Sequence, residues 1–227
     1  PVVDTASPRD MRGLRIGVPR AFIEGVDTAV ANAFATAIDA WRALGATIVD
    51  ITLPNVSLAI PVYYLIATAE ASSNLARYDG VRYGHRATLS PQDTLRTMYE
   101  RSRDEGFGAE VKRRIMLGTY ALSAGYYDAY YGRALKVRRR IAADFATAYE
   151  RADVLLTPAS PTVAFHLGDK TSDPMSMYLC DTYTIPSNLT GDPAMSVPFG
   201  TGDDGLPVGV QILAPALQEA TMFRTAA

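Results

Sequence analysis

The sequence predicts an α/β protein in which a mixed β-sheet carries helices on both faces. Three observations indicate this class. A strand, a helix and a second strand follow one another within the first 54 residues. Residues 57–160 are mainly helical in pattern, and two strands separated by a Gly/Asp loop come near the end. A crossover helix favours parallel pairing and a short loop favours a hairpin, so one sheet should contain both kinds of pairing.

The first strand and helix are the most clearly marked elements. Apolar residues alternate from Leu14 to Val18, which is typical of a short strand. Asp27 is placed to cap a helix, and Gly45 is placed to end it. A second strand is expected over Ala46–Leu53. The buried stripe of the helix is expected at Val30, Phe34, Ile38, Trp41 and Leu44.

The middle of the chain predicts several helices separated by glycines. Ser90 is expected to cap one of them, with Pro91 at its first position. The helices are expected over Leu58–Tyr78, from Ser90 to the glycines at 106 and 108, over Glu110–Leu117 and over Tyr126–Arg151. The last of these should bury Ala134, Val137, Ile141, Phe145 and Ala148.

The last third returns to strands. Asp153–Pro158 is a compact apolar run typical of a buried strand. Ala194–Phe199 and Pro207–Leu213 flank the loop at 201–205 and predict a hairpin, and a helix is expected from Leu217. No repeat or linker is evident. We therefore expect an arm or linker over residues 1–12 and a single domain over 13–227.

Composition excludes several classes of protein. The 227 residues carry a formal net charge of −2, which gives no global electrostatic basis for binding nucleic acid. No apolar run is long enough for a membrane span, so a soluble, cytoplasmic protein without membrane contact is expected. The lone Cys180 excludes an intrachain disulfide framework. His85 and His166 are far apart in sequence, and we expect no metal site.

No complete catalytic site can be identified from the residues alone. The chain lacks a Gly-x-Ser-x-Gly elbow and the glycine-rich phosphate-binding patterns. Both histidines are predicted to lie on the surface. The basic residues from Lys136 to Arg140 favour a solvated helix face, with an RNA phosphate contact as the alternative. The tyrosines at 126, 127, 130 and 131 favour helix packing over base stacking.

Four stretches together resemble the amidase-signature family. They are Tyr63–Gly84, Glu105–Gly118, Gly125–Tyr131 and Val154–Thr162. Within the first, Glu-Ala-Ser-Ser-Asn-Leu-Ala-Arg at positions 70–77 is similar to the glutamine-hydrolysing subunits of tRNA-dependent amidotransferases rather than to generic amidases. The resemblance extends from about Gly13 to the end, and it implies the α/β amidase-signature fold.

The resemblance also implies a reaction. Such subunits hydrolyse glutamine with a Ser–cis-Ser–Lys triad and release ammonia. A partner, the B subunit, uses ATP and Mg²⁺ to amidate the glutamate or aspartate of a misacylated tRNA, and a small C subunit helps hold the assembly together. The family's nucleophile lies in a Gly-Gly-Ser motif, and this chain contains no Gly-Gly pair. We therefore expect the C-terminal half of such a glutamine-hydrolysing protein, with no catalytic triad residue and no cofactor of its own, and inactive alone.

The resemblance places three substrate contacts in this half, at Tyr63, Arg114 and Asp181. Their chemistry suits glutamine. Arginine provides planar paired donors for the α-carboxylate, and an aspartate accepts from the α-ammonium group. A tyrosine hydroxyl can bond the substrate while its ring forms an apolar wall. Without the resemblance, Arg114 is one more exposed charge in Lys112-Arg113-Arg114, and Asp181 is a helix cap.

Two other functions stay open at this point. The chain could belong to another amidase-signature hydrolase that acts on a different amide, or to a non-catalytic interaction domain with the same half-fold. In either case a half-domain should expose an apolar face and a sheet edge, and we expect such a chain to self-associate.

Overall fold

The computed structural model describes residues 10–171, 173–202 and 205–227, and it divides the chain into two compact units. We call residues 1–60 and 137–227 the sheet unit and residues 61–136 the helical unit. The expectation of a single domain over residues 13–227 stays a prediction. The helical unit is inserted into the sheet unit between two of its strands, and the sequence shows no linker because the connections run through the helices α2 and α5.

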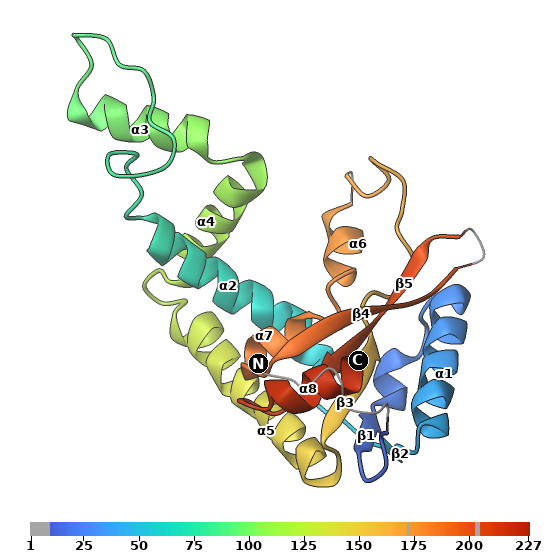
Figure 1. Cartoon of the computed structure of the whole chain (residues 1–227). Helices are drawn as coiled ribbons and strands as arrows, with labels where there is room; N and C mark the ends of the chain where they lie inside the picture. The colour runs from blue at the N-terminus through green and yellow to red at the C-terminus, as the bar shows by residue number, and fades with distance from the viewer. Residues whose placement is uncertain (1–9, 172, 203–204) are drawn as a thin grey trace. The chain divides into compact units, whose positions relative to one another are not determined.

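The sheet unit contains five strands with helices around them (Figure 1). The strands are β1 (Arg15–Val18), β2 (Thr47–Asp50), β3 (Val154–Pro158), β4 (Ala194–Thr201) and β5 (Pro207–Leu213). The helices are α1 (Thr28–Ala43), α5 (Arg133–Arg151), α6 (Pro174–Leu179), α7 (Ile185–Thr190) and α8 (Glu219–Ala226), with short 3-10 turns at Arg20–Ile23 and Val56–Leu58.

The sheet is mixed, as predicted. Its strand order is β2-β1-β3-β5-β4, with β2, β1 and β3 parallel and β5 antiparallel to both β3 and β4. The parallel part is connected through α1, and the antiparallel part is the predicted hairpin. The strand β2 lies on one side of β1 and β3 lies on the other, so the order of the parallel strands reverses direction at β1. Such a switch point opens a crevice at the carboxyl ends of parallel strands.

One face of the sheet packs against α1 and α8. Alternate residues of β1, β3 and β5 point into this core, because successive side chains of a strand face opposite sides. The Trp41 indole N–H donates to the Thr225 carbonyl at 2.9 Å and joins the two helices. The core holds Ile16, Val18, Phe34, Ile38, Trp41, Val154, Leu156, Val210, Ile212 and Met222 among its buried members.

The opposite face of the sheet is covered by the segment that leads into α7. The Gln211 side-chain amide donates to the Thr157 hydroxyl at 3.0 Å and to the Tyr183 carbonyl at 2.7 Å. Another hydrogen bond connects α5 to α7, in which Arg138 Nε–H donates to the Leu189 carbonyl at 2.6 Å. Helices therefore lie on both faces, which confirms the predicted architecture.

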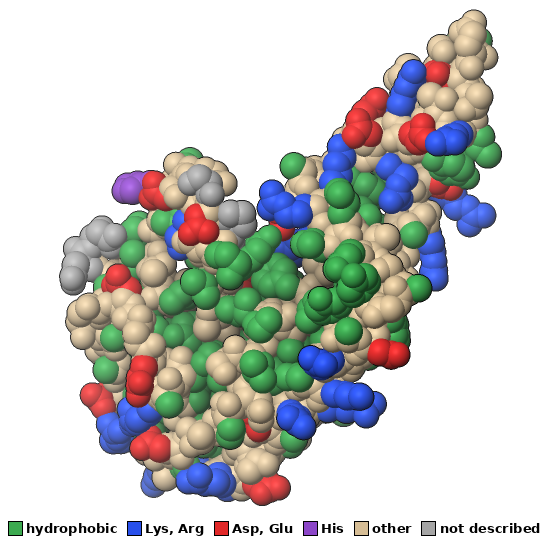
Figure 2. All heavy atoms as spheres, turned by 180° about the vertical axis from the view of Figure 1, so that it is seen from behind, with side chains coloured by type: hydrophobic (Ala, Val, Ile, Leu, Met, Phe, Trp, Pro, Cys, Tyr) green, Lys and Arg blue, Asp and Glu red, His purple; other side chains and the backbone are tan. Residues whose placement is uncertain are grey.

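The helical unit contains all but the first two residues of α2 (Ala59–Leu75), together with α3 (Leu95–Gly106), α4 (Ala109–Ala121) and a π-helical turn over Asp128–Gly132. Gly118 of α4 packs directly on α2. A Cβ atom at this position would lie 1.9 Å from the Thr68 carbonyl oxygen, so only glycine permits the contact. Figure 2 shows acidic and basic side chains mixed along α3 at the upper right, in keeping with ion pairs such as Arg96–Glu100.

Several boundaries differ from those predicted. The helix expected from Ser90 begins instead after Thr94, because Asp93 accepts the Ser90 N–H at 2.7 Å and closes a turn, and Thr94 then caps α3. Leu44 is exposed, since it lies at the end of α1, and Val137 is only partly buried. Leu217 lies before α8 and is exposed.

Two further findings concern segments that the sequence described poorly. The short helices α6 and α7 were not anticipated, because each is only six residues long and has little periodicity. Residues 1–9 of the predicted arm lie outside the described residues. Met11, within the same arm, is 3% exposed and packs into the core, so the folded sheet unit begins before residue 13.

Candidate functional site

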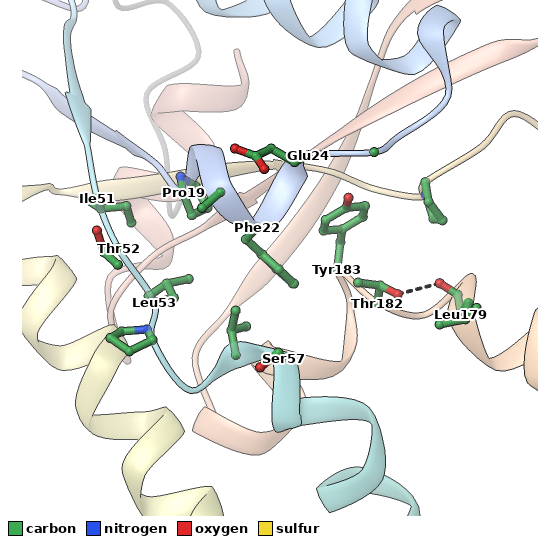
Figure 3. A pocket seen from close by; sticks show the side chains of 15 residues that line it. Pro19, Phe22, Glu24, Ile51, Thr52, Leu53, Ser57, Leu179, Thr182 and Tyr183 are labelled. Atoms are coloured by element: carbon green, nitrogen blue, oxygen red, sulfur yellow. Dashed lines mark hydrogen bonds between the residues drawn. The ribbon is translucent and has the colours of Figure 1, made fainter.

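A cavity of about 630 Å³ opens at the carboxyl ends of the parallel strands β1, β2 and β3 (Figure 3). Its walls come from the segments that follow these strands and from residues 179–183. Phe22, Leu53 and Leu179 are among its apolar walls, and Glu24 and Ser57 add polar groups. This is the position at which a switch point in an α/β sheet is expected to form a ligand site.

Hydrogen bonds and an aromatic contact hold residues 179–183, which form one wall of the cavity. Tyr183 is buried, and its ring packs edge-to-face on Phe22 with the centroids 5.1 Å apart. Burial raises the pKa of the Tyr183 phenol, so this hydroxyl stays protonated and can donate. The Thr182 hydroxyl donates to the Leu179 carbonyl at 2.6 Å, as the dashed line in Figure 3 shows. Gln211 fixes the same wall from the sheet by its bond to the Tyr183 carbonyl.

Asp181 lies in this wall segment, directly before two residues that line the cavity. Its side chain is exposed, and its backbone carbonyl accepts the N–H groups of Thr184 and Ile185. The alternative role of Asp181 as a side-chain cap of α7 is not supported, because the N-cap residue of that helix is Thr184. The carboxylate is thus carried on an ordered turn and is accessible to a ligand.

Arg114 lies on α4 in the helical unit, within a small cluster of side chains. Its Nε–H donates to Glu110 Oε1 at 3.0 Å, and its guanidinium lies over the Tyr64 ring, 5.4 Å from the ring centre. The Tyr63 hydroxyl lies close enough to the same guanidinium to raise the pKa of Arg114. The Tyr63 and Tyr64 rings pack edge-to-face at 5.2 Å. The structure therefore brings Tyr63 and Arg114 together, as the predicted shared site requires.

Two opposing effects act on the Arg114 guanidinium. Partial burial lowers its pKa, but the hydrogen bond to Glu110, the Tyr63 hydroxyl and the nearby Tyr64 raise it, and the net pKa lies above the ordinary value. Arg114 therefore stays fully charged. A permanently charged, partly desolvated guanidinium is a suitable binding group for a carboxylate.

The three predicted site residues belong to two units. Tyr63 and Arg114 are in the helical unit and Asp181 is in the sheet unit, so a joint role for all three stays a prediction. Sequence reasoning missed Glu110 and Tyr64. The signal for Glu110 was available, because an acidic residue four positions before an arginine on a helix is placed to pair with it. Tyr64 had no comparable signal.

Two of the remaining titratable candidates, His85 and Cys180, each lie next to a charged side chain. Both histidines are exposed, as predicted, and His85 Nε2 pairs with Glu105 Oε2 at 2.7 Å. Cys180 is partly buried, and Lys170 Nζ lies 3.0 Å from its sulfur. Across residues 10–171, 173–202 and 205–227, no three His, Cys, Asp or Glu side chains gather as a metal site would require. None of the described helices is long and apolar enough to span a bilayer.

Comparison with known proteins supplies a context for this geometry. Over 217 residues the chain is 57% identical to the A subunit of Glutamyl-tRNA(Gln) amidotransferase from Thioalkalivibrio sulfidiphilus, covering 95% of this chain and 44% of that protein. The protein of the same name from Maricaulis maris is 54% identical over 220 residues, with 96% and 44% covered. The chain thus spans less than half the length of these relatives and corresponds to their C-terminal part.

Solved structures agree with the fold. The crystal structure of the A subunit of Glutamyl-tRNA(Gln) amidotransferase from Thermotoga maritima matches with a TM-score of 0.71 at 37% identity, covering 96% of this chain and 42% of that one. A 6-aminohexanoate cyclic dimer hydrolase matches with a TM-score of 0.71 at 19% identity, covering 99% and 47%, and shows the fold alone. The family model described as Amidase matches residues 1–223. The chain therefore belongs to the amidase family.

Proposed function

We propose that this chain is part of the glutamine-hydrolysing component of a tRNA-dependent amidotransferase. The observation that carries the proposal is the 57% identity, across 95% of the chain, to a protein named as the A subunit of Glutamyl-tRNA(Gln) amidotransferase. The fold is shared by amidases of several substrates, so the fold by itself does not select the substrate. The high identity, together with the Arg114 cluster, favours glutamine.

The chemistry of the cluster supports an amino acid substrate. Arg114 would bind the α-carboxylate of glutamine, with the Tyr63 hydroxyl as a neighbouring donor, and Asp181 would accept from the α-ammonium group. The side-chain amide would then be presented to a nucleophile supplied by the rest of the longer protein. Hydrolysis would yield glutamate and ammonia, and the ammonia would be the nitrogen donor for the second reaction.

The second reaction belongs to the assembly. In this proposal the B subunit uses ATP and Mg²⁺ to convert Glu-tRNA(Gln) or Asp-tRNA(Asn) to the amidated form, and the C subunit helps hold the complex together in the cytoplasm. The 227 residues contain no Gly-Gly-Ser motif. We expect no glutamine turnover by this stretch alone, because loss of an entire catalytic triad lowers rates by several orders of magnitude. Turnover that a serine-directed reagent abolishes would contradict this expectation.

The decisive test compares two nitrogen donors in the full-length protein, assembled with its partners. Arg114→Ala and Asp181→Ala should each lower glutamine-dependent activity by about thirtyfold or more, since truncating one partner of a charged contact costs roughly 2–5 kcal/mol. Activity with added ammonia should hardly change, because ammonia bypasses the glutamine site. Arg96→Ala, which removes an exposed charge paired with Glu100, serves as the control.

Each outcome of this test has a distinct meaning. Loss with glutamine alone supports the substrate role of the residue. Equal loss with both donors would indicate a structural role instead. Full activity with glutamine in both variants would show that the predicted contacts are wrong. Activity on another amide, without any on glutamine, would favour a different amidase.

A further inference from the structure

We propose that Glu110 and Tyr64 are positioning residues that hold the Arg114 guanidinium ready for a substrate carboxylate. The inference rests on the proposed function, because it takes Arg114 to be the carboxylate-binding group. It adds that the affinity and the selectivity for an α-carboxylate depend on two side chains that do not themselves touch the substrate.

Glu110 fixes the edge of the guanidinium. Its Oε1 accepts the Arg114 Nε–H at 3.0 Å, and its Oε2 accepts from Arg113 Nη1 at 2.7 Å, so each carboxylate oxygen holds a different arginine. Glu110 also lies in the first turn of α4, where the helix dipole favours a negative charge. Since Nε is occupied, the contact to a ligand carboxylate falls to the terminal nitrogens Nη1 and Nη2. Two parallel N–H donors on these nitrogens match the two oxygens of a carboxylate.

Tyr64 fixes the face of the guanidinium. The Arg114 guanidinium lies over the Tyr64 ring, with its central carbon 5.4 Å from the ring centre, which is the distance of a cation–π contact. Tyr63 supports the Tyr64 ring at its edge. With one face covered and one edge bonded, the guanidinium plane has little freedom left to rotate.

The platform beneath Arg114 is itself rigid. Tyr64 is on α2 and Arg114 is on α4, so their contact depends on the spacing of these helices. Gly118, one turn beyond Arg114, brings the backbone of α4 against the Thr68 carbonyl of α2. A close backbone contact of this kind holds α2 and α4 at a fixed separation. The Tyr64 ring therefore stays beneath the Arg114 guanidinium.

Preorganisation has a thermodynamic consequence. An arginine side chain that must be immobilised on binding lowers affinity through lost conformational entropy, and one that is already immobile does not. Glu110 and Arg113 are largely exposed, so their ion pair should contribute little to folding stability. The role of Glu110 should therefore appear in substrate binding and not in the stability of the protein.

The test compares glutamine with glutaminamide, in which a neutral carboxamide replaces the α-carboxylate. The assembled full-length protein is used, and the rate of side-chain amide hydrolysis is followed for both compounds. Glu110→Gln and Tyr64→Leu should raise the KM for glutamine about ten- to a hundredfold, with kcat nearly unchanged. Both should reduce the preference for glutamine over glutaminamide by a similar factor. Tyr64→Phe keeps the ring and should behave like the unaltered protein.

Matched controls separate the positioning role from general damage. Glu100→Gln removes an equivalent exposed partner of Arg96 on α3 and should change neither parameter. Glu110→Asp keeps the charge on a shorter side chain and should fall between the unaltered protein and Glu110→Gln. Thermal melting of Glu110→Gln should stay close to that of the unaltered protein, because its ion pairs are largely exposed, and this result assigns the change in KM to binding.

The remaining outcomes distinguish the inference from the proposed function. If Arg114→Ala keeps the preference for glutamine over glutaminamide, Arg114 does not bind the carboxylate, and the proposed function loses its substrate contact. If Arg114→Ala loses the preference but Glu110→Gln and Tyr64→Leu keep it, only the positioning role is overturned. If Glu110→Gln lowers kcat and ammonia-dependent activity together, Glu110 is structural, and the inference is again wrong.

Discussion

The sheet unit and the helical unit bury their side chains in different ways. In the sheet unit, completely buried aliphatic residues such as Ile16, Leu156 and Ile212 come from strands far apart in sequence. In the helical unit, close packing of α2 and α4 relies on glycine at 118, and Met116 and Leu117 of the same helix are exposed. The sheet unit therefore has a long-range aliphatic core, whereas the packing of α4 on α2 depends on close approach of the two backbones.

This difference bears on how each unit holds its own predicted substrate contacts. Asp181 is held by backbone hydrogen bonds in a turn that the sheet supports through Gln211. Arg114 is held by side chains of its own helix and of α2, through the hydrogen bond to Glu110 and the contact with the Tyr64 ring. Contacts between side chains are lost more easily by local opening than backbone hydrogen bonds supported by a sheet, so Arg114 should be more sensitive than Asp181 to neighbouring substitutions.

The largest expected effect comes from the core of the sheet unit. Leu156→Ala in the full-length protein should lower the free energy of unfolding by about 2–5 kcal/mol, because it leaves a cavity among fully buried side chains. Leu117→Ala, at a half-exposed position of the helical unit, should change it by about 0.5 kcal/mol or less. Denaturant unfolding measures both. Equal losses would mean that the two units do not differ in the way described.

An intermediate effect is expected where α4 crosses α2. Gly118→Ala places a methyl group against the Thr68 carbonyl and should destabilise the helical unit by about 1–3 kcal/mol. Hydrogen exchange should quicken in α2 and α4 and stay unchanged in β3 and β5. Gly132→Ala is the control, since its nearest neighbours would lie at 3.6 Å and alanine favours a helix. Faster exchange in the sheet strands would show that the units open together.

The smallest effect is a pH dependence confined to the sheet unit. The side-chain hydrogen bond from Arg15 is the main cause that lowers the pKa of Asp153, against partial burial, which raises it. Because the folded pKa lies below the unfolded value of about 3.9, this stabilisation is present above that pH and is lost as the pH falls through the folded pKa. Both side chains are about a third or more exposed, so the contribution should stay below about 1 kcal/mol.

The measurement compares Asp153→Asn with the unaltered protein at pH 7 and at pH 3. The variant should be slightly less stable at pH 7, and the difference in stability should narrow at pH 3, because this pH lies below the unfolded pKa of about 3.9. A gap that widens toward pH 3 would reverse the sign and exclude the Arg15 contact as its cause.

Much of the fold could be predicted from the sequence because it depends on local patterns. The capping of α1 by Asp27 and the hairpin of β4 and β5 follow from neighbouring residues, and the structure confirms both. The prediction failed where two nearby residues could both cap a helix. Thr94, and not Ser90, caps α3, because the Asp93 side chain accepts the Ser90 N–H and holds Ser90 in a turn before the helix.

The candidate site residues likewise include some features that the sequence predicts and others that depend on tertiary contacts. By itself, the sequence determined the residue types, the likeness to the amidase-signature family and the spacing of Glu110 from Arg114, because these are properties of the order of residues. Only the tertiary structure decided that Tyr64 lies beneath Arg114 and that Gln211 supports the Tyr183 wall. It also decided that residues 61–136 form a separate unit. Tyr64 and Arg114 are about fifty positions apart and Gln211 and Tyr183 are 28 apart, so these contacts arise from helix crossings and sheet packing that no local pattern in the sequence specifies.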